Sequence, residues 1–193
     1  MPVRENPLVA GYYYHVYNRV SDGMRLFNLK ENYRFCIKLL RRYALKCDVN
    51  IIAYCLMQNH YHMLAFQNKE GGLSKFISVL FNAYVQAFNK QHKRKGPLFA
   101  DRFKNTPVEK EEYILHLCRY IHLNPVKANL VKHPEDWEFS DYRDWINRKA
   151  LQNEKRNFIQ DYFTDSDFYR QFVAEYQYDE EFENIISKYY LES

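Results

Sequence analysis

Two histidines separated by one residue are the clearest candidates for chemistry in this sequence. His60 and His62 lie in the stretch HYHMLAFQ, which has the composition of a β-strand. Side chains two residues apart in a strand point to the same face, about 7 Å apart along it, so the two imidazoles can converge on one metal ion. The same spacing also occurs in ordinary pairs on a half-exposed strand, so the pattern alone does not establish a metal site.

A tyrosine and an asparagine four residues apart form the second candidate group. Tyr120 and Asn124 lie at the C-terminal end of a stretch with helical periodicity. Residues four apart lie near the same face of a helix. A tyrosine flanked by leucine and isoleucine is usually a core aromatic, and that interpretation stays open here. His122 lies away from the Tyr120 face and is a further candidate ligand that we rank below Asn124.

Hydrophobic patterns predict the elements that must position these side chains. Strands are expected over residues 11–20, 50–57, 60–67 and 98–108, and helices over residues 31–47, 73–93 and 109–123. Gln58 and Asn59 are typical of a hairpin turn before the third strand. Pro125 is expected to end the last helix, because a residue before proline is pushed out of the helical conformation. This order predicts an α+β fold, a small antiparallel β-sheet covered by α-helices.

Length and charge indicate one basic body with an acidic extension. The chain has 193 residues, 47% of them hydrophobic, which suits a single compact core. Residues 1–133 carry 21 Lys and Arg against 9 Asp and Glu, whereas residues 134–193 carry 7 against 15. We expect a domain over residues 1–145 that attracts polyanions, and a helical acidic extension over residues 146–193 with a break between Asp161 and Asp167. The extension is also a candidate competitor of DNA for the basic surface.

Composition excludes several other classes of protein. No stretch approaches about twenty apolar residues and the N-terminus lacks the apolar core of a signal peptide, so a cytoplasmic protein without membrane contact is expected. The four cysteines form no CxxC pair, which argues against a zinc ribbon. Cys36, Cys55 and Cys118 lie among apolar neighbours and are expected in the core.

Four segments, in order along the chain, resemble one known family. The stretch CLMQNHYHMLAF resembles the MPNHxHLL signature of single-tyrosine HUH transposases, in which two histidines flank a hydrophobic residue, here Tyr61. The stretch RYIHLNPVKANLV resembles the RYIxxNPVRAGLV signature of the REP-associated tyrosine transposase branch. YHVYNRV and GPLFADRFKNTPV are similar to further segments of that branch, and the resemblance covers roughly residues 11–142. Gln58 and Asn129 replace the usual proline and glycine, at positions without an expected catalytic role.

The resemblance implies an enzyme, a metal-dependent DNA transposase or endonuclease of a prokaryotic cell, nucleoid-associated when bound to DNA. Members of the family cut and rejoin single-stranded DNA through a 5′-phosphotyrosine intermediate, and this branch is expected to recognise hairpin DNA. By motif position, Tyr120 would be the nucleophile, and His60 and His62 would bind Mg²⁺ or Mn²⁺. Asn124 would be the third ligand, through its side-chain carbonyl. Three uncharged ligands leave the ion its full charge for a phosphate oxygen.

Basic residues in and beside the family-like segments are the expected DNA contacts, because Lys and Arg neutralise phosphates. This set comprises Arg19, Arg102, Lys104 and Arg119, together with the cluster Lys93, Arg94 and Lys95. For the cluster, a solvated helix end is an equally good interpretation, since cations favour helix C-termini.

Two alternatives and one structural question remain open from the sequence. The first alternative is a non-catalytic, regulatory nucleic-acid-binding protein on the same fold. The second is a metal-dependent hydrolase of small phosphate esters, which has less need of a basic body. A homodimer is possible, and the sequence does not decide whether Tyr120 meets the histidine pair of its own chain or of a second copy.

Overall fold

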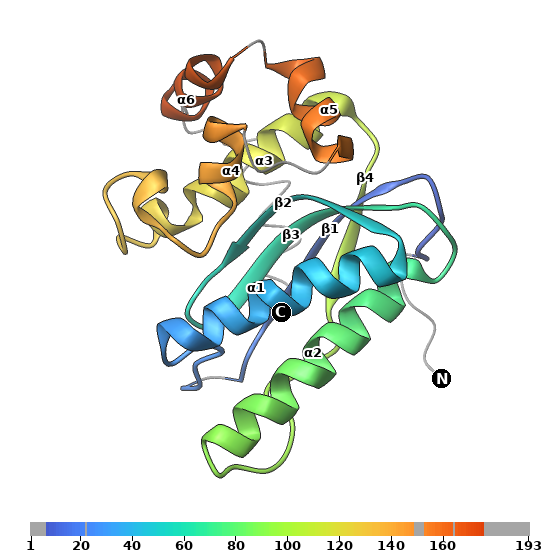
Figure 1. Ribbon diagram of the computed structural model, residues 1–193, viewed down its shortest axis with the longest axis vertical. Helices are drawn as coiled ribbons and strands as arrows, with labels where there is room; N and C mark the ends of the chain where they lie inside the picture. Colours follow the sequence, from blue (N-terminus) through green and yellow to red (C-terminus); the bar gives the residue numbers. More distant parts are fainter. Residues whose placement is uncertain (1–6, 22, 149–152, 164, 176–193) are drawn as a thin grey trace.

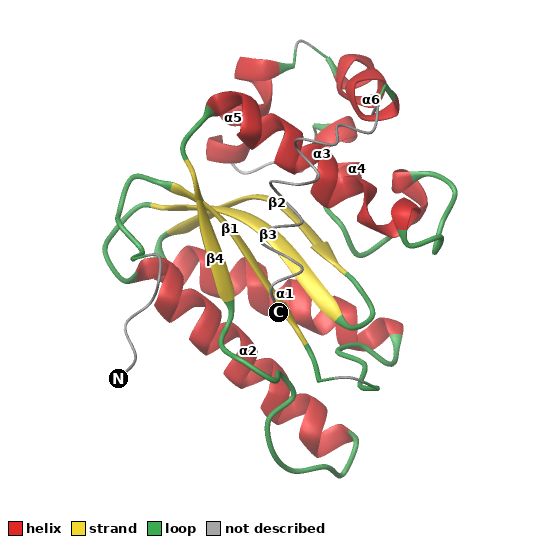
Figure 2. Ribbon diagram, turned by 180° about the vertical axis from the view of Figure 1, so that it is seen from behind, coloured by secondary structure: helices red, strands yellow, loops and turns green. Residues whose placement is uncertain are grey.

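A four-stranded antiparallel sheet forms the centre of the protein, as Figure 2 shows. The computed structural model describes residues 7–21, 23–148, 153–163 and 165–175. The strands are β1 (Tyr13–Arg19), β2 (Val49–Leu56), β3 (His60–Gln67) and β4 (Lys104–Val108), in the order β2-β3-β1-β4. The expected α+β class, with a small antiparallel sheet and helices, is confirmed.

Two long helices cover one face of the sheet. α1 (Lys30–Cys47) and α2 (Gly72–Gln91) lie side by side against it (Figure 1). Inward strand residues such as Val16 and Met63 are fully buried beneath them. Gly72 permits the close approach at the start of α2, because a Cβ atom there would lie 2.9 Å from the backbone carbonyl oxygen of Cys47.

Shorter helices cover the opposite face. They are α3 (Glu111–Lys127), α4 (Tyr142–Asn147), α5 (Asn153–Tyr162) and α6 (Ser166–Ala174), and Figure 1 shows them together on the other side of the sheet from α1 and α2. A second hydrophobic cluster joins these helices to the sheet and includes Ile52, Leu64 and Trp145. The sheet is therefore covered on both faces, and α3 packs on β2 and on β3, the strand that bears the histidine pair.

Helix α3 continues through Pro125, so the prediction that it ends there is wrong. It reaches Lys127, and its end is fixed by hydrogen bonds that do not need the missing N–H of the proline. The carbonyl oxygen of Pro125 accepts from the N–H of Leu130 at 2.9 Å. Asn129 closes the helix end with a left-handed backbone, at a φ of 53°.

The last strand is shorter than predicted. β4 occupies Lys104–Val108 rather than residues 98–108. The residues before it run back beside the end of β1, where Phe99 forms an isolated bridge with Val20 and the side chain of Asn18 donates to the carbonyl oxygen of Asp101. The pattern of residues 98–103 therefore reflects a half-buried return segment rather than a strand.

The C-terminal helices share the core of the main body. α5 and α6 lie within the predicted extension, and the break between them falls between Asp161 and Asp167, as expected. The predicted boundary after residue 145 falls inside α4, and α5 and α6 contribute Ile159 and Tyr169 to the same cluster as α3. The boundary therefore does not separate two cores in the described structure. Residues 176–193 of the predicted extension lie outside the described residues.

The cysteines are buried free thiols, and Cys36, Cys55 and Cys118 are wholly inaccessible, as predicted for core residues. Across the described ranges, no helix combines the length and apolarity that crossing a bilayer requires.

Candidate active site

The β2–β3 hairpin fixes the position of His60. Gln58 and Asn59 form the predicted turn, closed by a 2.9 Å hydrogen bond from the N–H of Met57 to the carbonyl oxygen of His60. The two turn carbonyls are bound from outside: that of Asn59 accepts from the N–H of Val20 and that of Gln58 from the N–H of Leu26. A turn held by the neighbouring chain segment gives the imidazole that follows it a defined location.

His60 and His62 lie together on the face of the sheet beneath α3. Their ring centroids are 4.9 Å apart, and His62 is only 3% exposed. His15, on the adjacent strand β1, stacks on His62 with ring centroids 5.5 Å apart and planes inclined by 29°. His15 therefore packs against the His62 ring and orients it. In the sequence, His15 lies two residues before Tyr17, so the two side chains share one face of β1.

Helix α3 brings Tyr120 to the histidine pair of the same chain. The rings of Tyr120 and His62 meet edge to face with centroids 5.8 Å apart. The ammonium nitrogen of Lys127 lies 4.8 Å from the centroid of the Tyr120 ring, in a cation–π contact that holds the ring in place. Sequence reasoning missed Lys127, although its spacing of two helical turns from Tyr120 was a usable signal.

Asn124 lies at the same place. Its side-chain Nδ2 donates to the backbone carbonyl oxygen of Tyr120 at 3.0 Å, and its side chain also hydrogen-bonds to His60. Because Nδ2 is engaged by the helix backbone, the amide oxygen is the atom turned toward His60, and it is the atom that would contact a cation held there. The structure therefore brings together Tyr120, His60, His62 and Asn124.

The electrostatics of the pair favour neutral imidazoles. Burial, reinforced by the charge of Arg19 on the neighbouring strand, lowers the pKa of His60 to about 4. Burial also lowers the pKa of His62 well below its ordinary value, with His60 and His15 adding to the effect. Both rings are therefore neutral near pH 7, and neutral imidazole is the form that binds a metal ion.

The donor set fits a divalent ion. The side-chain carbonyl oxygen of Asn59 lies 2.7 Å from Nδ1 of His60, and since that oxygen only accepts, Nδ1 carries the proton and Nε2 keeps its lone pair. Such support of a ligating imidazole is typical of metal sites. Among the described residues no three His, Cys, Asp or Glu side chains are grouped to hold a metal ion. The groups beside His60 whose chemistry suits a divalent ion are the imidazole of His62 and the amide of Asn124. A set of imidazole and oxygen ligands suits Mn²⁺. Mg²⁺ prefers oxygen ligands, which the amide of Asn124 offers.

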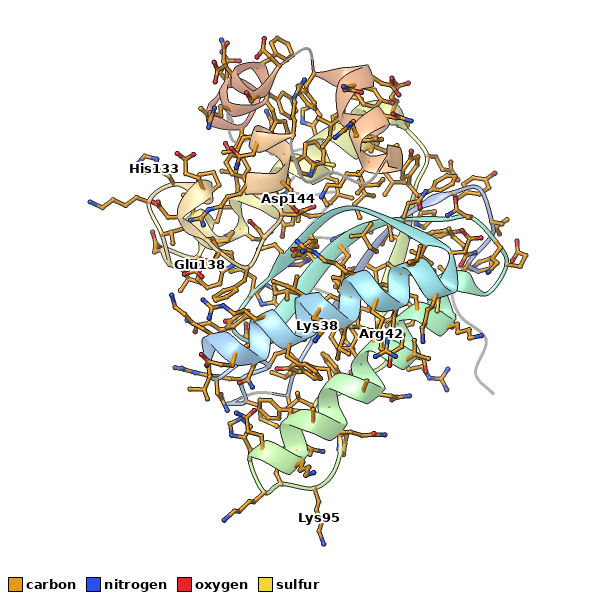
Figure 3. All side chains as sticks on the ribbon, in the orientation of Figure 1. Lys38, Arg42, Lys95, His133, Glu138 and Asp144 are labelled. Atoms are coloured by element: carbon orange, nitrogen blue, oxygen red, sulfur yellow. The ribbon has the colours of Figure 1, made fainter. Side chains whose placement is uncertain are left out.

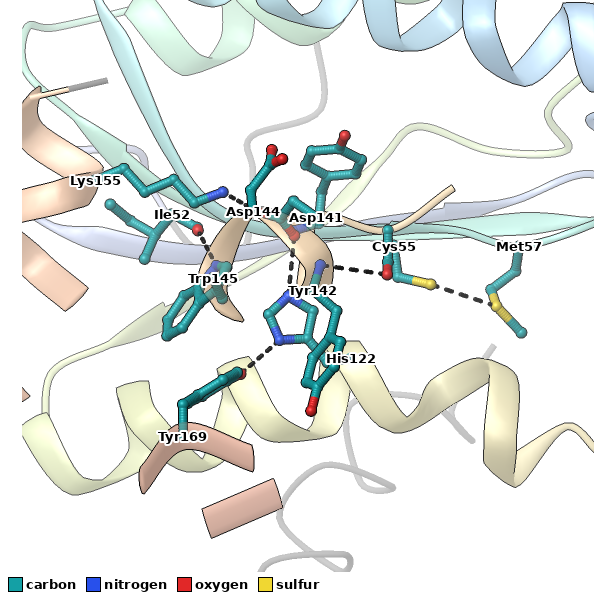
Figure 4. Close-up of polar contacts among 12 residues, drawn as sticks. Ile52, Cys55, Met57, His122, Asp141, Tyr142, Asp144, Trp145, Lys155 and Tyr169 are labelled. Carbon is teal, nitrogen blue, oxygen red and sulfur yellow. Dashed lines mark hydrogen bonds and ion pairs between the residues drawn. The ribbon is translucent and has the colours of Figure 1, made fainter. Parts of the chain in front are cut away.

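His122 belongs to a buried polar network on the other side of α3, shown in Figure 4, and is not a candidate ligand. Its Nε2 donates to Asp141 at 3.0 Å, and its Nδ1 accepts from the hydroxyl of Tyr169 at 2.5 Å. Asp141 also accepts from the N–H of Tyr54 at 2.7 Å and forms an ion pair with Lys155. Burial alone would raise the pKa of Asp141, but Lys155 and His122 outweigh it and hold that pKa at about 2. The network ties α3 to β2, α4, α5 and α6.

Three of the predicted DNA contacts lie near the histidine pair. Arg19 is exposed and directly opposite His60 in the β1–β3 register. Lys104 pairs with Tyr17 across β1 and β4, and Arg102 is exposed two residues earlier. Arg19, Lys104 and Arg102 therefore belong to the end of the sheet that borders His60.

The second predicted basic cluster lies elsewhere. Figure 3 shows Lys95 at the free tip beyond α2, away from the sheet. Lys93 is exposed, but Arg94 braces the turn, donating to Oδ1 of Asn89 at 2.7 Å and to the carbonyl oxygen of Pro97 at 3.0 Å. The structure therefore does not bring this cluster to the histidine pair.

Arg119 does not fit the predicted role of a DNA contact. It is only 7% exposed, and its guanidinium lies over the ring of Phe172 in α6, 4.5 Å from the centroid. It also donates to the carbonyl oxygen of Phe172 and contacts Nδ1 of His116 at 2.8 Å. Arg119 lies about 100° around the helix from Tyr120, and at that position its side chain packs against α6.

The fold and the site together have one defining arrangement, in which a histidine pair on the sheet meets a tyrosine on a helix. Residues 8–124 match the family model described as "Transposase IS200 like", and the chain belongs to this family of DNA-binding and DNA-cleaving proteins. Among solved structures, the chain is similar to a REP-associated tyrosine transposase bound to a REP hairpin, with a TM-score of 0.64 and 18% sequence identity, over 79% of this chain and 88% of that one. The structural likeness shows a shared fold. A comparison with curated proteins found no match.

Proposed function

We propose that this protein cleaves and rejoins single-stranded DNA, with Tyr120 as the nucleophile. The observation that carries the proposal is the meeting of Tyr120 with His62, at 5.8 Å between ring centroids, while Asn124 lies against His60 in the same chain. Tyr120 is half-buried at the edge of the second hydrophobic cluster, and its ring there lies beside neutral imidazoles and a lysine.

The proposed step is a transesterification. The phenol oxygen of Tyr120 attacks the phosphorus, the new O–P bond forms, and the bond from phosphorus to the 3′-oxygen breaks. The phenol gives up its proton, and the departing 3′-oxygen takes one up, so a 5′-phosphotyrosine and a free 3′-hydroxyl result. Because the phosphodiester is conserved in the covalent link, attack by another 3′-hydroxyl reverses the step without a further energy source.

The protein supplies position and charge for this step. His60, His62 and Asn124 would hold Mg²⁺ or Mn²⁺, which neutralises charge on the phosphate when bound. Lys127 and Asn124 hold Tyr120 by its ring and its backbone carbonyl, respectively. A pre-positioned nucleophile saves the entropy of bringing the reacting groups together.

Hairpin DNA of the REP type is the proposed substrate. The motif RYIHLNPVKANLV resembles that of the REP-associated branch, and the similar solved structure is of a REP-associated protein bound to a REP hairpin. The exposed cations Arg19 and Arg102 beside His60 suit phosphates that flank the cleaved bond.

A direct test is to incubate the purified chain with Mn²⁺ and a library of labelled DNA hairpins with single-stranded flanks. We expect a covalent protein–DNA adduct on denaturing gels, mapped to Tyr120 by mass spectrometry. Tight hairpin binding without any adduct would support the non-catalytic regulatory function instead. An adduct at a different residue would overturn the assignment of the nucleophile.

A further inference from the structure

A pocket of about 470 Å³ opens along α3 beyond Tyr120. Its walls are the last two turns of α3, the segment of residues 132–135 and the end of α6. Its volume lies in the range of small-ligand sites in proteins, about 300 to 1,000 Å³. None of the site residues predicted from the sequence lines it.

The lining combines an apolar floor with a mainly cationic rim. Leu123, Val126 and Val173 supply apolar surface. Its lining also includes Lys127, Lys132 and Arg170, against the single lining carboxylate of Glu135. Arg170 also forms an ion pair with Asp167 at 2.9 Å, outside the pocket. An apolar surface with several cations is complementary to an unpaired nucleotide, whose base has apolar faces and whose phosphate is anionic.

Lys127 connects the pocket to the candidate nucleophile. Its ammonium group contacts the face of the Tyr120 ring, and the residue also lines the pocket. Leu123 is the first residue of α3 that lines the pocket and lies three residues after Tyr120, so the pocket begins roughly 4.5 Å along the helix axis from the tyrosine. A DNA strand whose phosphate lies at Tyr120 therefore reaches the pocket with its neighbouring nucleotides.

Helix α6 completes the pocket from outside the family match, which ends at residue 124. Arg170 and Val173 come from α6, and the adjacent Tyr169 is bonded to His122 of α3 in the buried network of Figure 4. The C-terminal helices thus form a wall of this pocket, held at a fixed position relative to Tyr120.

We propose that this pocket binds one or two unpaired nucleotides of single-stranded DNA beside the phosphate attacked by Tyr120. The inference deepens the proposed function and rests on it for the direction of the strand. It adds a site for the flank of the substrate, formed in part by the C-terminal extension.

The test measures binding of a short fluorescein-labelled oligothymidylate by fluorescence anisotropy, in EDTA so that no cleavage occurs. Ala174 is exposed at the pocket wall, so Ala174→Trp fills the pocket at low risk to the fold. We expect it to weaken binding roughly tenfold, the loss of one stacked base. Gln171→Trp, exposed on the same helix outside the pocket, is the matched control and should bind like the natural chain.

Charge is tested separately. Arg170→Ala and Lys132→Ala should each lower the slope of log affinity against log salt by about 0.7, the value for one lost phosphate contact with a single strand. Lys38→Ala removes an exposed cation on α1, in the other helical layer (Figure 3), and should leave the slope unchanged. Thermal unfolding of each variant checks that the fold is retained.

The outcomes separate this inference from the proposed reaction. Nucleotide binding in the pocket would be contradicted by an unchanged oligothymidylate affinity of Ala174→Trp. Equal salt slopes for Arg170→Ala and Lys38→Ala would contradict it as well. Neither result bears on the proposed reaction. Pocket-dependent binding by a chain that forms no adduct with any hairpin would overturn the reaction and leave the pocket standing.

Discussion

The phenol ring of Tyr120 and the imidazole ring of His62 meet edge to face within one chain, with centroids 5.8 Å apart. Their elements come from distant parts of the sequence, and the contact exists because α3 lies across the face of β3 that bears both histidines. The candidate site is thereby complete in a single protomer. A second copy of the chain is not needed to bring the candidate nucleophile and the candidate ligands together.

Tyr120→Phe should abolish covalent attachment to DNA while hairpin affinity changes less than about twofold, because only the attacking oxygen is removed. The adduct is measured on denaturing gels and the affinity by gel shift. Tyr113→Phe makes the same chemical change earlier in α3 and should keep full adduct formation. An adduct that persists in Tyr120→Phe would exclude this tyrosine as the nucleophile.

The single-chain site makes a second prediction, for mixtures of variants. Tyr120→Phe lacks the candidate nucleophile, and His60→Ala lacks a candidate metal ligand. If the site were shared between two chains, a mixed dimer of the two variants would contain one intact site. Because Tyr120 meets the histidines of its own chain, we expect no adduct above the level of the separate variants. Recovery of about a quarter or more of natural activity on mixing would show that the site is shared.

Asn59→Ala should weaken Mn²⁺ binding by roughly ten- to a hundredfold, because the side chain fixes the tautomer and orientation of His60. Calorimetric titration of the DNA-free protein with Mn²⁺ measures this without any activity assay. Asn82→Ala, at an exposed position of α2, is the control and should bind the ion normally. Equal affinities for the two variants would mean that His60 is not a ligand supported by Asn59.

Local patterns predicted the strands and the hairpin turn, because each depends on residues close in sequence. The spacing of His60 and His62 sets a shared strand face, and that of Tyr120 and Asn124 a shared helix face. The alternating strand patterns and the resemblance of four ordered segments then placed these faces on one fold. The meeting of the two faces was an expectation of the resemblance, since no local pattern measures it.

The errors arose where tertiary contacts decide the outcome. Arg119 adjoins the nucleophile in sequence, yet one residue turns a helical side chain by about 100°, toward α6. Pro125 stays helical because residues beyond it cap the helix. The pairing of Asp141 with both His122 and Lys155 joins segments whose association has no local signal.

Lys155→Met should destabilise the protein by about 3 kcal/mol or more, because it leaves the ionised Asp141 buried without its cationic partner. Urea unfolding measures the change in the free energy of unfolding. Arg156→Met alters the exposed neighbouring residue in α5 and should cost less than about 0.5 kcal/mol. If the two variants were equally stable, the buried ion pair would not hold α5 onto the body.

Stability should fall in mild acid through the buried histidines. Burial lowers the pKa of His15 to about 3, whereas an unfolded histidine has a pKa near 6.5. Between these two values the unfolded chain binds a proton that the native chain does not, so each such histidine removes about 1.4 kcal/mol of stability per unit of falling pH. His60, with a pKa of about 4, contributes in the same sense.

Urea unfolding in EDTA at a series of pH values between about 6.5 and 4.5 gives this slope. His15→Asn should flatten it by about 1.4 kcal/mol per pH unit, whereas His133→Gln, at an exposed position, should not change it. An identical slope in His15→Asn would show that His15 is protonated in the native protein and does not stack on His62 as a neutral ring.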